Sequence, residues 1–219
     1  MDLEFMKTHA HLYVEAGKLT FNIAAISIVL SLVVGIITAL LRHYEIPILG
    51  KLSQVYVELS RNTPLLIQLF FLYFGLPKIG ILLSSEVCGI IGLTFLGGSY
   101  MSESFRSGIE SIEYSQIESG LSIGLKNSQV LYYIILPQAI TVSFPAILAN
   151  VIFLIKETSI FSIIALADLM YVARDLIGLY YNTDEALLML VIAYAVILIP
   201  ILVIFHLAER KLRYAGFGN

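Results

Sequence analysis

The feature that most constrains this chain is a set of long stretches without a charged residue. Leu19–Leu41 and Ala186–Ala208 each run for 23 residues between ionisable side chains, and Asn127–Ile155 runs for 29. A helix needs roughly 20 apolar residues to cross a hydrocarbon core of about 30 Å. Only 13% of the 219 residues are charged and 58% are hydrophobic, which is too little charge to cover a water-soluble domain. The sequence therefore predicts an integral membrane protein with one domain, residues 1–219.

Two further apolar stretches contain a few charged residues. One includes Glu58 and Arg61 in its first third, and the other ends with Glu103 and Arg106. Inside a bilayer only helices and closed barrels satisfy the backbone, and these stretches lack the alternation of barrel strands. The chain is therefore predicted to be all-α and polytopic. We expect five transmembrane helices, at about 19–41, 53–76, 87–109, 134–156 and 186–208.

Basic residues near the helix ends favour one orientation of the chain. With the N-terminus outside and the C-terminus in the cytoplasm, the inner segments hold seven Lys and Arg residues against four outside. The stretch from Ile160 to Asp184 mixes charges with a helical apolar pattern. We interpret it as a half-immersed outer helix, because a sixth crossing would move the basic C-terminus outside.

Two pairs of ionisable residues lie within the weaker spans, where they are costly and usually face a bundle interior. Glu58 and Arg61 are three residues apart on one helix face, which fits an internal ion pair or a gate. Glu103 lies one helical turn from both Ser99 and Arg106. It could pair with Arg106, or its carboxylate could receive a cationic or amine group.

A third polar group interrupts the apolar sequence "FLIKETSIF". Lys156 and Glu157 point about 100° apart on a helix, so lipid cannot suit both of them. A break in the helix near Thr158 would turn both charges inward. They could form a buried ion pair, or they could contact a zwitterion, with Lys156 near its carboxylate and Glu157 near its amine.

Signatures of common enzyme and metal chemistry are absent from the sequence. No G-x-x-x-x-G-K-[ST] loop, G-x-S-x-G elbow or H-E-x-x-H motif occurs. The histidines show no ligand spacing, and Cys88 alone can form neither a disulfide within the chain nor a cysteine metal cluster. The net charge of −3 gives no support for nucleic-acid binding. We predict a non-enzyme without catalytic residues, metal or cofactor, in which any energy source must come from a partner.

The stretch Tyr114–Ala139 interrupts the apolar sequence on the predicted cytoplasmic side. Its front half is polar and contains Gly120 and Gly124, which would share one face of a short helix over about 116–126. Small residues allow a partner's surface to come close. The pattern fits a docking helix, although an ordinary cytoplasmic loop would also explain it.

This stretch resembles the EAA loop of the permease subunits of binding-protein-dependent ABC importers. In that pattern E-A-A is followed by a glycine and then by I-x-L-P. Glu118 matches the acidic residue, Gly124 the glycine, and "IILP" ending at Pro137 the tail, while Ser119 and Gly120 replace the alanines.

Three further stretches resemble the polar amino-acid subfamily of these permeases, in the same order along the chain. They are "YVELSRNTPLLIQLFFLYFGLP", "GGSYMSESFRSGIESI" and "NVIFLIKETSIFSII". Gly98 and Ser107 depart from the subfamily's A-Y-x-x-E-x-x-R-G-G-I segment.

The resemblance implies a type I ABC importer permease fold in the bacterial inner membrane. It implies a dimer with an identical or related permease, two cytoplasmic ATPase subunits that carry ATP and Mg, and an extracytoplasmic binding protein. A polar or basic amino acid would cross by alternating access. The residues implied in ATPase coupling are Glu118, Ser119, Gly120, Gly124, Leu125 and Lys126. The residues implied in substrate binding are Ser99, Glu103, Lys156, Glu157, Thr158, Asn62 and Arg61.

Two other classes remain open from the residues alone. In an ion-coupled secondary amino-acid transporter or channel, Glu58, Glu103 and Glu157 would relay protons or cations without an ATPase. An intramembrane enzyme or assembly scaffold is the third alternative, but it would have no catalytic signature.

Overall fold

The computed structural model describes residues 1–216, with side chains through Lys211, and every secondary-structure element in this part is helical. The expected all-α fold is therefore confirmed. The elements are α1 (Leu3–His43), α2 (Leu49–Asn62), α3 (Leu65–Phe70), η1 (Phe71–Gly75), η2 (Leu76–Ile79), α4 (Ser85–Glu110), α5 (Tyr114–Ser122), α6 (Asn127–Val130), η3 (Leu131–Ile135), α7 (Leu136–Glu157), η4 (Thr158–Ile164), α8 (Leu169–Tyr180) and α9 (Thr183–Gly216).

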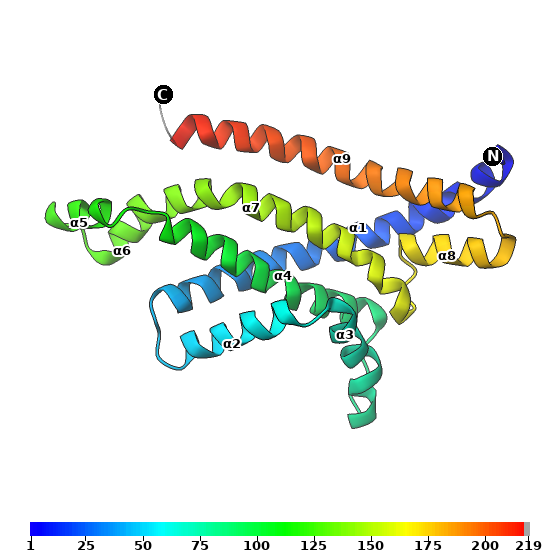
Figure 1. Ribbon diagram of the computed structural model, residues 1–219, viewed down its shortest axis with the longest axis horizontal. Coiled ribbons are helices and arrows are strands. Elements are labelled where there is room, and N and C mark those ends of the chain that lie inside the picture. Colours follow the sequence, from blue (N-terminus) through cyan, green and yellow to red (C-terminus); the bar gives the residue numbers. More distant parts are fainter. Residues whose placement is uncertain (217–219) are drawn as a thin grey trace.

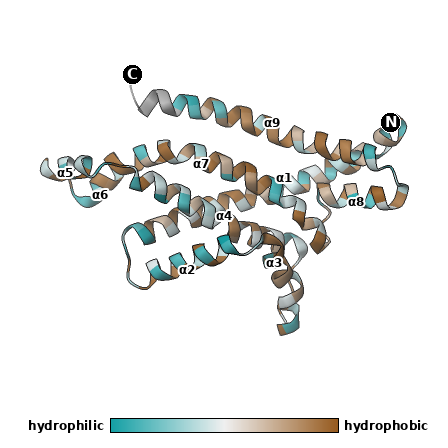
Figure 2. Ribbon diagram, viewed as in Figure 1, coloured by the Kyte–Doolittle hydropathy of each residue, from teal (hydrophilic) through white to brown (hydrophobic). Residues whose placement is uncertain are grey.

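The long helices run along one axis of the molecule (Figure 1). The N-terminus and α8 lie at one end, and α5 and α6 lie at the other. Hydrophobic colouring dominates the middle of the long helices, whereas α5 and α6 are more hydrophilic (Figure 2). This arrangement suits a bundle with an apolar belt between two polar ends.

Three helical stretches of the described chain are long and apolar enough to cross a membrane: Leu3–His43, Asn127–Ile164 and Thr183–Lys211. They contain the three uncharged runs, but each extends beyond the boundary expected from charge alone. The 26-residue α4 would reach about 39 Å, although it carries several charges. The number of five crossings therefore stays a prediction.

The helix expected over 53–76 is wrong as a single element, because the chain breaks at Thr63 and Pro64. Thr63 is extended, with φ −114° and ψ 123°, since the proline ring disfavours a helical conformation in the residue before it. The amide of Gln68 donates to the carbonyls of Ser60 at 3.2 Å and Thr63 at 2.9 Å, which satisfies both at the break. Beyond it, α3 and the short helices that follow point away from the bundle (Figure 1).

The centre of the bundle is α4, which packs against α1 and α7. A side chain on Gly97 would collide with Ser31 of α1 and would lie 2.7 Å from Leu154 Cδ1 of α7. Small residues let membrane helices approach closely where lipid offers no hydrophobic driving force. Next to this contact, the side chains of Leu93 and Met101 are fully buried.

Near Thr158 the helix changes type without breaking, so the expected break is wrong at this position. The α-helix α7 ends at Glu157 and continues as the 3-10 helix η4, after which Ala165 adopts a left-handed conformation with φ 55°. Asp168 then caps α8 by accepting a hydrogen bond from the backbone N–H of Tyr171 at 2.9 Å. With 12 residues, α8 reaches only about 18 Å, which is too short for a further crossing.

Candidate functional site

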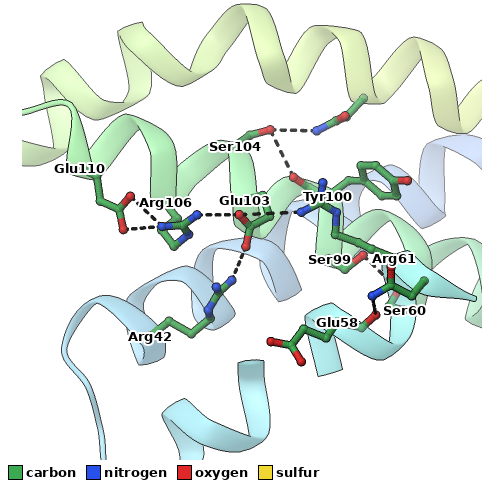
Figure 3. A network of polar contacts seen from close by, with 12 residues as sticks. Arg42, Glu58, Ser60, Arg61, Ser99, Tyr100, Glu103, Ser104, Arg106 and Glu110 are labelled. Atoms are coloured by element: carbon green, nitrogen blue, oxygen red, sulfur yellow. Dashed lines mark hydrogen bonds and ion pairs between the residues drawn. The ribbon is translucent and has the colours of Figure 1, made fainter. Parts of the chain in front are cut away.

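A cluster of charged side chains joins α1, α2 and α4, and Glu103 of α4 lies at its centre (Figure 3). The Glu103 carboxylate forms an ion pair with Arg42 of α1 and accepts a hydrogen bond from Arg106 Nη2 at 2.9 Å. Arg61 of α2 approaches the same carboxylate at 3.9 Å. Glu103 therefore stands among three guanidinium groups, so its carboxylate is already paired and is not a free receptor for an amine.

The predicted pair of Glu103 and Arg106 is confirmed, and Arg106 extends it along α4. The Nη1 atom of Arg106 donates to both carboxylate oxygens of Glu110, at 2.6 and 2.7 Å. Residues three and four apart share one helix face, so a single guanidinium can reach both acids. The two ion pairs fix Arg106 within the cluster.

The predicted pair of Glu58 and Arg61 is wrong. The Glu58 carboxylate accepts a hydrogen bond from Gln54 Nε2 at 2.9 Å, on the same helix. The Arg61 guanidinium instead lies over the ring of Tyr100 in α4, 5.2 Å from the ring centroid. Arg61 thus turns from its own helix toward α4, and 42% of its side chain remains exposed.

Two cavities open on either side of Arg61, Asn62 and Tyr100, which line both of them. The larger, of about 380 Å³, also has Arg42, Glu58 and Glu103 in its walls. The smaller cavity has a volume of about 270 Å³, and its walls are mainly apolar apart from Glu157 at the end of α7. Its other lining residues are Thr63, Pro64, Leu65, Leu66, Leu96, Phe153 and Ile160. The pair of cavities is large enough for a small polar molecule, with charge on one side and an apolar wall on the other.

Four of the seven predicted substrate residues line these cavities: Arg61, Asn62, Glu103 and Glu157.

The other three residues do not line either cavity. Ser99 is fully buried, donates to the Leu96 carbonyl at 2.7 Å and accepts from Ser60 at 3.0 Å, so it joins α4 to α2. Thr158 is also fully buried and donates to the carbonyl of Ile155 at 2.7 Å. Lys156 is exposed. In this conformation Lys156 and Glu157 therefore do not act as one zwitterion clamp.

Sequence reasoning missed Arg42 and Tyr100 as parts of the site. Arg42 follows the uncharged run that ends at Leu41, and in the sequence it indicated only the orientation of the chain in the membrane. Its pairing with Glu103 was missed because the two residues lie 61 positions apart. Tyr100 directly follows Ser99, but an aromatic residue in a membrane helix is too common to indicate a binding site.

The predicted docking segment differs in detail from one continuous helix. The helix α5 ends at Ser122, and Gly124 has φ +89°, a conformation that favours glycine. The N–H of Gly124 donates to the Leu121 carbonyl at 3.0 Å, and that of Leu125 to Gly120 at 3.2 Å. These two bonds form a Schellman cap, so Gly124 terminates the helix and does not share a face with Gly120.

The outer surface of this segment combines polar and apolar side chains. Glu118, Ser119 and Lys126 are exposed, and Ile123 and Leu121 are 79% and 41% exposed. A hollow of about 490 Å³ lies beside them, between α5 and the start of the α7 helical stretch. Its lining residues are Ser115, Gln116, Ser119, Gly120, Ile123, Tyr133, Ile134 and Gln138.

The inner side of the segment is held in place. A side chain on Gly120 would lie 2.6 Å from Ile134 Cδ1, so only glycine fits without a shift. Leu125 is half-buried against a small core that contains Val130 and Ile135. A firmly seated segment with exposed apolar side chains at a polar end of the molecule is typical of a protein-docking surface.

Comparison with known proteins places these features in one family of transporters. Residues 20–214 match the family described as binding-protein-dependent transport system inner membrane component. The chain is 42% identical over 159 residues to the probable glutamine ABC transporter permease protein GlnP of Bacillus subtilis (strain 168), covering 73% of each chain. It is 35% identical over 199 residues to the probable amino-acid ABC transporter permease protein PatM of Vibrio harveyi, covering 90% of this chain and 89% of that protein.

Solved structures share the same architecture. A structure described as an amino acid ABC transporter with histidines superimposes with a TM-score of 0.89 at 27% identity, covering 96% of this chain and 99% of that one. An inward-facing MetNI methionine ABC transporter superimposes with a TM-score of 0.74 at 18% identity, which indicates a shared fold.

Proposed function

We propose a substrate class for this chain, which belongs to the binding-protein-dependent transport system inner membrane components and is the multi-pass permease subunit of an ABC importer for amino acids. The substrate is a polar or basic amino acid. The permease works in a complex with an ATPase and a binding protein. In our proposal the N-terminus is outside, the C-terminus is cytoplasmic, and a separate chain hydrolyses ATP. The substrate crosses by alternating access around a site between the helices.

The observation that carries the proposed site is the pair of cavities that meet at Arg61. A guanidinium binds a carboxylate through two parallel hydrogen bonds, and Arg61 is accessible to such a partner. We assign the α-carboxylate of the substrate to Arg61, with Asn62 beside it. The α-ammonium then faces Glu58 in the larger cavity or Glu157 in the smaller one.

The remaining predicted substrate residues act around this contact. Glu103 holds the arginines of α1 and α4 and keeps Arg61 turned toward the cavities. Ser99 sets the distance between α2 and α4 next to Arg61, because its hydroxyl accepts the hydrogen bond from Ser60. Lys156 and Thr158 flank Glu157 at the end of α7, and they reach the substrate only if this junction moves during the cycle.

We further propose that two cytoplasmic ATPase subunits grip the segment around α5 in a permease dimer, whose second subunit is identical or related. The exposed Leu121 and Ile123 fit an apolar hollow on an ATPase, and Glu118, Ser119 and Lys126 surround them with polar contacts. Gly120, Gly124 and Leu125 keep the segment seated on the bundle. Closure of the ATPases would then move the two permeases as rigid bodies.

The test is uptake by proteoliposomes that contain the permease, its ATPase and the binding protein, with a panel of labelled amino acids. The Arg61→Gln variant should lower uptake about tenfold or more, the loss expected when a charge-assisted hydrogen bond to a carboxylate is removed. Lys78→Gln, an exposed basic residue outside both cavities, is the matched control.

Uptake by Arg61→Gln at the wild-type rate would overturn the assignment of the carboxylate. Uptake driven by a proton or sodium gradient in vesicles that lack the ATPase would instead favour the ion-coupled transporter.

A further inference from the structure

An apolar groove of about 670 Å³ runs between the first half of α1 and the first half of α9, far from the charged cavities. On α1 its wall includes Ala10, Val14 and Phe21, which are spaced four and seven residues apart and so lie on one helix face. On α9 the wall includes Ile192 and Val196, which are 48% and 65% exposed. The groove is thus open along a side of the bundle that faces away from the protein core.

A hydrogen bond between α1 and α9 fixes the separation of the two walls of the groove. Tyr13 of α1 is buried and donates its hydroxyl proton to the Ala186 carbonyl of α9 at 2.7 Å. At the outer end, the backbone N–H of Asp2 donates to Glu185 at 2.7 Å. A preformed groove costs its occupant less ordering of the protein than one that must open first.

Two lysines mark one edge of this apolar surface. Lys7 and Lys18 both line the groove and both are exposed. They are 11 residues apart on α1, which corresponds to three turns or about 16 Å along the same edge. Glu4 and Glu15 of the same helix do not line the groove. The lining of the groove therefore contains two cationic side chains and no carboxylate.

The position of the groove along the helices matches the headgroup region of a bilayer. On α1 it lies mainly before the uncharged run that begins at Leu19, and on α9 it includes the first turns of the run that begins at Ala186. Lysine stems can lie along apolar surface while the ammonium reaches the phosphate level. Basic side chains near a membrane surface attract anionic lipid headgroups electrostatically.

We propose that this groove is a resident site for a phospholipid with a negatively charged headgroup. One acyl chain lies along the apolar floor between α1 and α9, and the phosphate pairs with Lys7 or Lys18. Since it concerns the lipid-facing side of the bundle, the inference is independent of the substrate proposed above. It makes transporter stability sensitive to the anionic fraction of the membrane.

The experiment is native mass spectrometry of the assembled transporter in detergent, titrated with phosphatidylglycerol or with phosphatidylcholine of the same acyl chains. We expect phosphatidylglycerol to form adducts at a lower concentration. Replacing by Gln whichever of Lys7 and Lys18 pairs with the phosphate should weaken this binding about fivefold, the change that corresponds to roughly 1 kcal/mol per basic residue at an anionic surface, and the double variant Lys7→Gln/Lys18→Gln should weaken it at least as much. Lys78→Gln should leave it unchanged.

A second variant tests the acyl-chain contact without altering charge. Val196→Trp should fill the groove and abolish the preference for phosphatidylglycerol. Val203→Trp is the matched control, because Val203 is two turns further along the same face of α9, is 53% exposed and does not line the groove.

Three results would overturn the proposal. The first is equal binding of the two lipids by the wild type. The second is an unchanged preference in Val196→Trp. The third is loss of the permease dimer in Val196→Trp when the wild type carries no lipid adduct, since this would make the groove an interface between two copies of the permease.

Discussion

The α2–α4 contact and the exposed face of α9 differ in the polarity of their side chains. Between α2 and α4 the contacts are polar: Tyr56 and Ser60 both donate to the carbonyl of Phe95, at 2.7 and 2.9 Å. The exposed face of α9 is apolar, and residues such as Val203 point outward. In a water-soluble protein this distribution would be reversed. The comparison shows that lipid allows charges and hydroxyls to gather inside, where they can bind one another and a polar substrate.

The largest effect that would test this comparison is expected at the centre of the charged cluster. Glu103→Gln removes the negative charge among Arg42, Arg61 and Arg106 and leaves three guanidinium groups that repel one another. Breaking a fully buried ion pair by removing one partner typically costs about 3–5 kcal/mol, and because the Glu103 side chain is 21% exposed we expect a cost at or below the lower end of this range. We expect a strong fall in the thermal unfolding temperature of the purified permease and loss of uptake.

Glu110→Gln is the control for this experiment, because Glu110 is more exposed, at 54%, and touches Arg106 alone of the three arginines. Equal unfolding temperatures for the two variants would mean that the interior cluster contributes no more than a surface pair.

A somewhat smaller effect is expected at the close contact of α1, α4 and α7. Gly97→Leu places a side chain against Ser31 and Leu154, and overpacking of this kind costs about 1–3 kcal/mol or more. The yield of folded protein and its melting temperature in detergent should both fall. Gly178→Leu, at a site with open space around it, should change neither. A neutral Gly97→Leu would show that the helices are free to separate here.

A third prediction concerns movement rather than folding. Gly124→Asp meets no atom within 4 Å, so it should strain the turn by roughly 1 kcal/mol while the chain still inserts into the membrane. ATP-driven uptake should nevertheless be lost, because the charge lies beside the proposed ATPase surface.

Gly80→Asp provides a close match for this variant, because Gly80 has φ +86° and also has no atom within 4 Å. It lies at the other side of the bundle, and uptake by this control should persist. Equal uptake by the two variants would count against the docking role of the segment after α5.

The smallest effect is expected on the exposed apolar face of α9. Val203→Leu exchanges one apolar side chain for another at an exposed position. The free energy of unfolding should change by less than about 0.5 kcal/mol, and the rate of uptake should not change measurably. Differential scanning fluorimetry in detergent and the uptake assay would measure both. A large loss at this position would reveal a protein contact where the comparison places lipid.

Local rules explain what the sequence determined by itself. The uncharged runs located the three membrane-crossing stretches, since the length of an apolar run is a local property. The break at Thr63 and Pro64 is also a local effect, because a proline restricts the residue before it whatever its surroundings. The order of four short motifs also identified the family, although α1 begins at Leu3 instead of 19 and α5 ends at Ser122 instead of 126.

Only the tertiary structure decided which side chains meet. The sequence predicted a pair of Arg61 with Glu58, whereas the packing of α2 against α4 brings Arg61 to 3.9 Å from Glu103. Arg42 joined the same carboxylate from 61 residues away, and the groove that Lys7 and Lys18 line lies between the first halves of α1 and α9. These contacts depend on where helices cross and at what angle. Side-chain packing across the whole bundle sets that geometry, and no periodicity within one helix encodes it.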